Sequence, residues 1–486
     1  MRSMRALGAV LALGAATLVA GCGGGGGAAN AALPAGASTV PDNAAALISV
    51  VSKLDAPQVQ QAESLISRFP AGQQALTRFH EFEQTAGPAL GDELDLVWLD
   101  FANDGNVVVG LTQPKDQAKF DELLAKSDNP PVHEVVDGWT VLAQDQATID
   151  KYKEQKANTG SLSDDGDFQH ALGDLPDDSL ARAYVSGTAI RTQLDAAIAR
   201  GGVPPAVAQQ LPAIESLGAA LTPQEDGARL DATLSGDLKV NPTSFHAGLP
   251  AELPSGAIAY VGVSNLEDSL RRAIDTVGKT RPNFDQQRAQ VEAVLGLSFD
   301  KDVLPLFAGE GALAVYPSAG TPVPAIVFAE KVSDEDAAKH VISRLTAIGQ
   351  VGAAGRVTTV PIGGVEATKI TLGEQGSIYA AEFGGKIVVT NSPTTISDMQ
   401  SSAPKLADDP PYKSAVASAG VPDETLGFLY VNAHDGLRYA FSYFAKRTGQ
   451  TVSPEVLANT DPLQSLLLST SKEGDQFRFS GFLGIQ

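Results

Sequence analysis

Apolar runs of strand length alternate with amphipathic helical stretches along most of the chain. In the first half, this pattern predicts strands at 45–51, 94–101, 107–112, 133–136, 139–143, 180–186, 214–221 and 227–235. Apolar positions at helical spacing predict helices at 57–68, 72–84, 115–126, 146–154, 168–172 and 188–199.

Short turns connect several of these strands. Asp104-Gly105 lies between two apolar runs, which is a hairpin signal, and strands joined by such turns pair antiparallel. We therefore expect an α+β fold, a mostly antiparallel sheet with helices packed on one face.

The pattern occurs twice. LPDDSLARAYVSG, Leu175–Gly187, is matched by VPDETLGFLYVNA, Val421–Ala433, and further pairs of segments keep the same order. The spacing between copies grows by roughly 25 to 30 residues within Gln350–Phe383, which predicts an added strand pair in the second copy. We expect two tandem related modules, 39–237 and 253–486, joined by a proline-containing linker at 238–252.

The N-terminus has the order of a secretory signal. Arg2 and Arg5 precede an apolar run that is too short to span a bilayer comfortably. Its ending, Val19-Ala20-Gly21-Cys22, resembles a bacterial lipobox, and Cys22 is the only cysteine of the chain. This predicts a signal peptide at 1–21, cleavage between Gly21 and Cys22, and acylation (palmitate among the chains) of Cys22 as a membrane anchor.

A glycine-rich segment follows, so 22–38 is expected to be the lipidated cysteine and a flexible tether. The predicted location is the cell membrane or envelope, outside the cytoplasm, with the membrane as a partner through the anchor.

Charge narrows the range of partners. The net charge is −22, and nucleic-acid binding requires a basic surface, so we expect no nucleic-acid partner.

No recognisable catalytic or metal-binding motif is present. The chain lacks HExxH, CxxC, GxSxG and the P-loop pattern, and we expect no cofactor and no metal. Gly309–Ala314 has a GxGxxA shape but opens a strand, whereas a dinucleotide loop opens a helix. Ser469-Thr470-Ser471-Lys472 fits SxxK but leads into a hairpin turn, and His434-Asp435 has no counterpart in the first copy.

Two aspartate pairs are the remaining polar candidates. LSDDGDF contains Asp164-Asp165, and LADDPPY contains Asp408-Asp409. A cap residue before a short helix accepts a backbone amide bond, so we interpret Asp165 and Asp409 as structural N-caps rather than catalytic groups. With prolines at 410 and 411, Tyr412 is the expected amide donor in the second copy.

The Leu-x-Asp-Asp-x-x-aromatic and Pro-Asp strand signatures resemble a family of secreted or membrane-anchored bacterial proteins known only as a domain of unknown function. That resemblance implies no activity. We expect a non-enzymatic envelope lipoprotein whose modules bind a protein partner or a small apolar ligand on an open sheet face or between the halves. The alternatives are a hydrolase using two carboxylates about 5 to 10 Å apart, and a purely structural or assembly lipoprotein.

Overall fold

A computed structural model describes residues 33–101, 107–127, 129–202, 213–238, 242–281, 283–318, 323–352, 356–373 and 376–486. The chain divides into two compact units, and each is described by itself. The first unit comprises Met1–Val240, Ser453–Leu463 and Thr470–Gln486, and the second comprises Asn241–Val452 and Gln464–Ser469.

The first unit alternates strands with helices, close to the pattern expected from the sequence. Its strands are β1 (Ala46–Val51), β2 (Glu93–Trp98), β3 (Val108–Thr112), β4 (Val132–Val136), β5 (Trp139–Ala143), β6 (Ala181–Ser186), β7 (Ala213–Gln224), β8 (Gly227–Asp237) and β18 (Gln476–Ile485). Its helices are η1 (Ala35–Ser38), α2 (Pro57–Ser67), α3 (Pro70–Ala86), α4 (Gln117–Ala125), α5 (Gln146–Thr159), η3 (Leu162–Asp164), α6 (Gly166–Leu172), α7 (Gly187–Ala199) and α15 (Pro454–Thr460).

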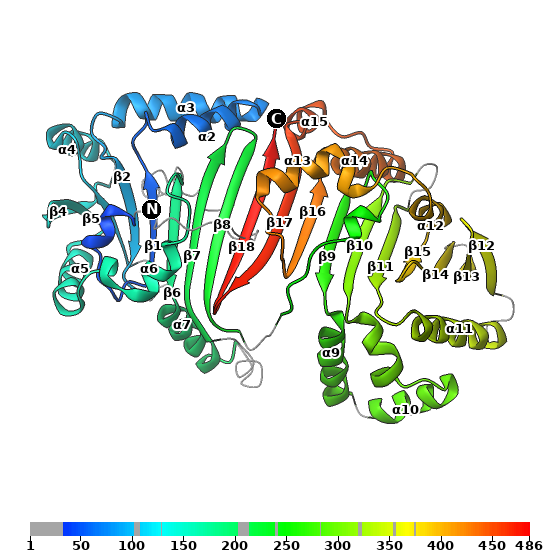
Figure 1. Ribbon diagram of the computed structural model, residues 1–486. Coiled ribbons are helices and arrows are strands. Elements are labelled where there is room, and N and C mark those ends of the chain that lie inside the picture. Colours follow the sequence, from blue (N-terminus) through cyan, green and yellow to red (C-terminus); the bar gives the residue numbers. More distant parts are fainter. Residues whose placement is uncertain are drawn as a thin grey trace. The chain divides into compact units, whose positions relative to one another are not determined.

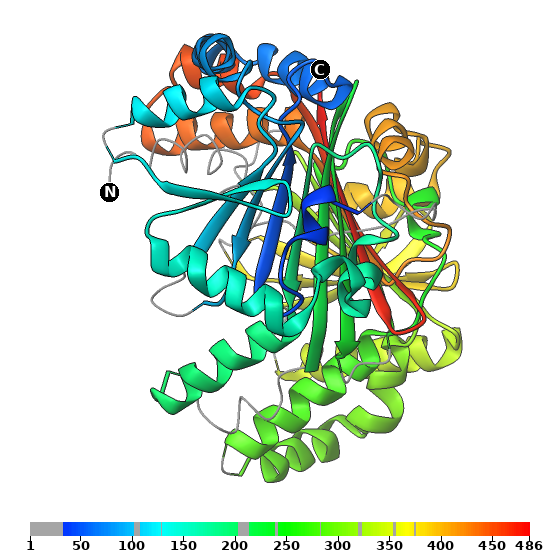
Figure 2. The ribbon, with the colours of Figure 1, turned by 90° about the vertical axis from the view of Figure 1, so that its left-hand side faces the viewer.

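These strands form one antiparallel sheet in the order β4-β5-β3-β2-β1-β6-β7-β8-β18. The long strands β7, β8 and β18 run side by side in Figures 1 and 2. The last strand of the chain therefore completes the sheet of the first unit, although the sequence assigned it to the second repeat.

The second unit repeats this topology. Its strands are β9 (Ala259–Ser264), β10 (Glu310–Tyr316), β11 (Ala325–Lys331), β12 (Val357–Ile362), β13 (Val365–Thr371), β14 (Ser377–Phe383), β15 (Lys386–Thr390) and β16 (Gly427–Asn432), paired antiparallel in the order β12-β13-β14-β15-β11-β10-β9-β16. Strand β17 (Leu463–Glu473) has residues in both units.

Its helical segments are η4 (Leu249–Ala251), α9 (Leu266–Thr280), α10 (Phe284–Leu295), η5 (Phe299–Val303), η6 (Leu304–Phe307), α11 (Glu335–Gly352), α12 (Pro393–Gln400), η8 (Leu406–Asp408), α13 (Pro410–Ala419) and α14 (Ala433–Thr448).

Strand pairing shows which residues of the two repeats correspond. In the first unit Leu47 lies between Val97 and Tyr184, and in the second Tyr260 lies between Ala314 and Tyr430. Outside this shared arrangement, β12 and β13 form the extra strand pair predicted within Gln350–Phe383.

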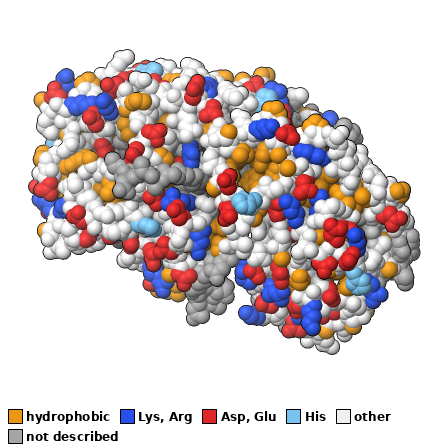
Figure 3. All heavy atoms as spheres, viewed as in Figure 1, with side chains coloured by type: hydrophobic (Ala, Val, Ile, Leu, Met, Phe, Trp, Pro, Cys, Tyr) orange, Lys and Arg blue, Asp and Glu red, His pale blue; other side chains and the backbone are white. Residues whose placement is uncertain are grey.

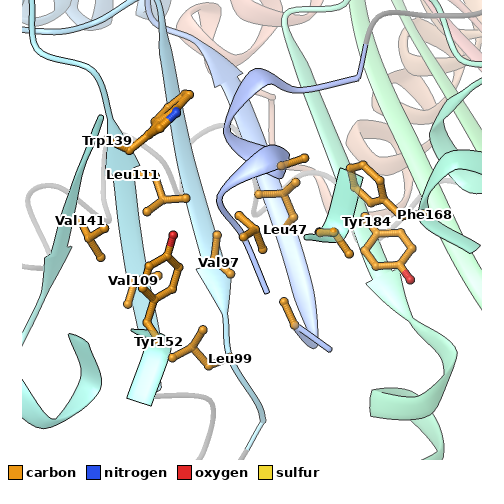
Figure 4. Packing of buried hydrophobic residues seen from close by; sticks show 14 of the residues in the cluster. Leu47, Val97, Leu99, Val109, Leu111, Trp139, Val141, Tyr152, Phe168 and Tyr184 are labelled. Carbon is orange, nitrogen blue, oxygen red and sulfur yellow. The ribbon is translucent and has the colours of Figure 1, made fainter. Parts of the chain in front are cut away.

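One face of each sheet, the helix-covered face, carries the core. In the first unit α5 and α6 bury it, and Leu47, Val97, Val109, Trp139, Val141, Tyr152, Phe168 and Tyr184 pack there (Figure 4). In the second unit Tyr412 of α13 packs edge-on against Tyr430 with ring centroids 5.1 Å apart. Phe168 and Tyr184 make the same contact at 5.0 Å in the first unit.

The fold class is therefore the one predicted, α+β with antiparallel sheets. The strand-forming runs place apolar side chains on both faces of each sheet. Helices α5, α6 and α13 pack on one of these faces, and the central strands keep partly exposed apolar side chains on the other.

Candidate functional site: an open apolar sheet face

The opposite face of the first sheet, here called the open face, is apolar across its central strands. On β1, β2, β6, β7 and β8, alternate residues point away from the helix-covered core, and each of them is half-buried. They are Ile48, Val50, Leu94, Leu96, Trp98, Ala181, Ala183, Val185, Leu217, Ala219, Leu221, Leu230, Ala232 and Leu234.

The second unit has the same surface at corresponding register positions on β9, β10, β11 and β16. Its members are Ala259, Val261, Val263, Leu313, Val315, Ile326, Phe328, Leu429 and Val431. Leu313 and Ile326 are each 42% exposed, far above the fully buried residues on the other face. The open face is thus a feature of both repeats.

The chemistry of this surface is simple. Backbone groups in the middle of a sheet are already hydrogen-bonded, and these side chains are aliphatic or aromatic and carry no charge. A contiguous exposed apolar surface often marks a place for a ligand or a partner. Elsewhere, the view in Figure 3 shows acidic and basic side chains interspersed.

Helices border the open face at its margins. In the first unit Gln61 Nε2 of α2 donates to the Gln224 carbonyl at the end of β7, 2.9 Å away. On the β4 side, Phe120 of α4 meets the ring of His133 edge-on. In the second unit α11 packs Ala338 and Val341 into a cluster that includes Ile387. On β11, Phe307 of η6 also lies against Phe328, with ring centroids 6.3 Å apart. The other central strands lie between these margins.

Glu330 is the charged exception on the open side of β11. It lies opposite Gly311 in the β10–β11 register, and Leu266 approaches the same place from α9. Neither carboxyl oxygen has a hydrogen bond of good geometry, and the side chain is fully buried. Burial is the main cause that raises the pKa of Glu330 to about 8. The Gly309 amide lowers this pKa by a smaller amount, and the charge of Glu310 raises it further. At neutral pH the group is a protonated acid at the margin of an apolar face.

The two predicted cap aspartates behave differently. Asp165 stands at the N-cap of α6, and its Oδ1 accepts from the Phe168 amide at 2.7 Å. Asp409 has the N-cap position of α13, but its Oδ2 accepts from the Gly256 amide at 2.8 Å and makes no side-chain cap. The expected Tyr412 donor is therefore wrong. With prolines at the first two helical positions, the carboxylate instead accepts from the Gly256 amide, which lies in the segment before β9.

Buried carboxylates are the observation that most favours the hydrolase alternative. On the helix-covered face, Asp95 is fully buried two residues from Glu93, and its pKa is raised well above the usual range, first by burial and then by the charge of Glu93. Glu93 in turn accepts from the Gly36 amide at 2.8 Å. A Cβ on Gly36 would lie only 1.7 Å from Asp95 Oδ2, so the η1 turn seals this pair from any substrate.

The second repeat uses the same contact for a structural purpose. Glu310, the counterpart of Glu93 in the strand register, accepts from the Leu249 amide of η4 at 2.8 Å. Each of these glutamates thus ties the turn that enters its repeat to the second strand of the sheet. The same structural hydrogen bond in both repeats explains Glu93 and Glu310 better than a catalytic role does.

A cavity of about 10 Å³ in the first unit is lined by Asp174, Asp231, Arg478 and neighbouring residues, room for about one water molecule. It is too small for a substrate.

The other polar motifs fall into structural roles. Gly309–Ala314 runs into β10 and Ser469–Lys472 lies on β17, as the sequence indicated. Asp435 pairs with Asn432 at the start of α14, where Asn432 Oδ1 accepts the Asp435 amide. Within the described residues no group of His, Cys, Asp and Glu is arranged to hold a metal ion.

Gly21, Cys22 and the predicted signal peptide, and most of the predicted tether, lie outside the described residues. None of the helices in the described part of the chain has the length and hydropathy to cross a membrane.

Sequence reasoning anticipated an open sheet face in general terms but missed its residues. Trp98, for example, lies opposite Ala46 on the open face of the first sheet, and its counterpart in the second sheet is Val315, which lies opposite Ala259. The available signal was the strand sequences themselves, because runs such as ALISVV are apolar at both odd and even positions.

Solved structures offer only distant likeness. Crystal form I of TP0453 is 10% identical, with a TM-score of 0.24, over 51% of this chain and 93% of that one. Crystal form III is 12% identical, with the same TM-score, over 50% and 94%. Values this low support no argument about this chain. No curated protein matches it. The model of the family described as "Protein of unknown function (DUF3352)" matches residues 98–483, most of the chain, and the protein belongs to that family.

Proposed function

We propose that this protein is an exported, lipid-anchored, non-enzymatic binding protein whose open sheet faces hold the aliphatic chain of a membrane lipid. The observation that carries the proposal is the repeated open face, apolar and half-buried at the same register positions in both units. A surface that recurs in both copies of a duplication is better explained by a shared use than by chance.

Its chemistry favours an aliphatic chain over a polar ligand. Small and branched side chains such as Ala183, Val185 and Ala219 have no hydrogen-bond donor, and Trp98 is the one residue named on this face whose side chain has one. Sugars, nucleotides and metal ions would find no partner there. Each buried methylene of a chain would contribute roughly 0.8 kcal/mol, so a long acyl chain suits the length of such a strip.

The expected anchor supplies access to this ligand. An acylated Cys22 followed by a glycine-rich tether would hold the units beside a bilayer, where lipid chains are abundant. The protein's own acyl chains share the same chemistry, so an experiment must separate the two sources.

Binding of pyrene-labelled phosphatidylcholine to the full chain tests the proposal, with Cys22→Ser protein as the arm that lacks acyl chains of its own. We expect saturable binding in both arms. Leu313→Asp and Ile326→Asp should weaken binding at the second unit at least tenfold and leave binding at the first unit unchanged. Val294→Asp is the matched control, because Val294 is 70% exposed on α10 and lies off the open face. Equal binding by Ile326→Asp and Val294→Asp would refute the assignment of the face. Markedly stronger binding in the Cys22→Ser arm would show that the protein's own acyl chains occupy the face. Binding lost in that arm would show that the labelled lipid associates with the anchor and not with the face, and would refute the proposal.

A further inference from the structure

Strand β4 forms an edge of the first sheet. It pairs with β5 along its whole length, from Val132 opposite Ala143 to Val136 opposite Trp139. Among the described residues no strand pairs with its other edge. The backbone groups on that side are therefore available to another strand.

The second repeat shows what such an edge can accept. Strand β14 of the second sheet is the equivalent of β4. His133 of β4 pairs with Leu142 of β5, and the equivalent Ala380 of β14 pairs with Val389 of β15. There, β13 lies antiparallel against β14 and places Thr368 opposite Ala380. The position beside β14 is filled by a strand of the extra hairpin, and the described part of the first repeat supplies no such strand.

The two outer strands also differ in how they are protected. β12, which borders the second sheet, carries Pro361, and proline blocks a backbone donor. β4 has no proline, no lysine and no bulge, and Val135 is 60% exposed. Glu134 does not fold over the edge, because both of its carboxyl oxygens accept from Lys153 Nζ on α5 at 2.9 Å.

We propose that the free edge of β4 binds an extended segment of a partner polypeptide as an added antiparallel strand, in the position that β13 occupies in the second repeat. The bound segment takes the alternating pattern of a strand and carries a basic residue, as β13 carries Lys369. Beside the edge, Glu134 and Asp150 share the single cation of Lys153, and Asp121 contacts His133, so carboxylates outnumber lysines there. A second copy of the chain is the poorer occupant, since full-register pairing of β4 with itself sets Glu134 opposite Glu134. The proposal does not depend on lipid binding.

A labelled peptide with the β13 sequence, Val365–Thr371, is the direct probe, and fluorescence anisotropy with the full chain gives its affinity. We expect saturable binding by the wild type and at least tenfold weaker binding by Val135→Lys, which places a lysine on the edge strand. Val294→Lys is the matched control, because Val294 is also an exposed valine. The same peptide N-methylated at alternate residues should not bind, because it loses the donors of one edge.

Hydrogen exchange should show protection of β4 amides on peptide addition and none in β12. Equal affinity for Val135→Lys and Val294→Lys, unchanged affinity after N-methylation, no binding at all, or dimers that Val135→Lys abolishes would each overturn the proposal.

Discussion

Glu330→Gln isolates the energetic cost of the buried acid on the open side of β11. Glutamine keeps the shape of the side chain but cannot ionise. In the folded unit the pKa of Glu330 is about 8, against 4.5 for a free glutamate. The fold thus favours the protonated acid, while the unfolded chain ionises freely above pH 4.5.

The sign follows from proton counts. Between pH 4.5 and 8 the folded state binds one proton more than the unfolded state, so the free energy of unfolding falls as pH rises, by about 1.4 kcal/mol per pH unit. Below pH 4.5 both states are neutral at this site and the cost vanishes. Between pH 5 and pH 8 the free energy of unfolding of the wild type should therefore fall by about 3.5 kcal/mol because of this group, and that of Glu330→Gln should not.

The assay must report on the second unit. Both tryptophans, Trp98 and Trp139, belong to the first unit, so their fluorescence during urea unfolding serves as an internal control that should not change. Hydrogen exchange of β10 and β11 amides gives the opening free energy of the second unit. Glu366→Gln, at an exposed position on β13, is the matched variant. A Glu330→Gln advantage that stays flat or shrinks from pH 5 to pH 8 would refute the buried, protonated state.

Three further predictions concern the repeated features. Asp165→Ala and Gly36→Ala are measured by chemical denaturation at pH 7, and Asp409→Ala is measured by hydrogen exchange. Asp165→Ala should lower the free energy of unfolding by about 0.5 to 2 kcal/mol through loss of the α6 cap, and a change within error would contradict the cap. Asp409→Ala should leave hydrogen exchange in the first turn of α13 unchanged but speed exchange of the Gly256 amide, because that amide donates to the Asp409 carboxylate. Faster exchange in the first turn of α13 with unchanged exchange at Gly256 would instead support Asp409 as the helix cap. Gly36→Ala should destabilise the first unit because its Cβ would overlap Asp95, whereas Gly166→Ala, with open space around it, should not; equal effects would show that the η1 turn is not sealed on Asp95.

The sequence predicted the elements well where periodicity was strong. β6 begins within one residue of the expected position and α7 likewise, and the extra hairpin was located from spacing alone. The turn Asp104-Gly105 lies outside the described residues, so that hairpin signal stays a prediction.

What the sequence could not predict depends on pairing between distant segments. The return of β18 to β8 joins residues about 250 positions apart, and no local pattern signals it. The hydrogen bond between the Gly256 amide and the Asp409 carboxylate also joins distant segments, and it replaces the local helix cap that the sequence predicted. The open face was hidden because a strand apolar on both sides is expected to be buried on both sides.

Photolabelling tests the central claim most directly. Full-length Cys22→Ser protein is incubated with vesicles containing phosphatidylcholine that bears a diazirine near the end of one acyl chain, irradiated, and digested for mass spectrometry. The account predicts adducts on open-face residues of β1, β2 and β6–β8, and of β9–β11 and β16, with labelling at Ile326 and Leu313 competed by unlabelled lipid. Adducts confined to exposed helices such as α10, or labelling that unlabelled lipid does not reduce, would contradict it.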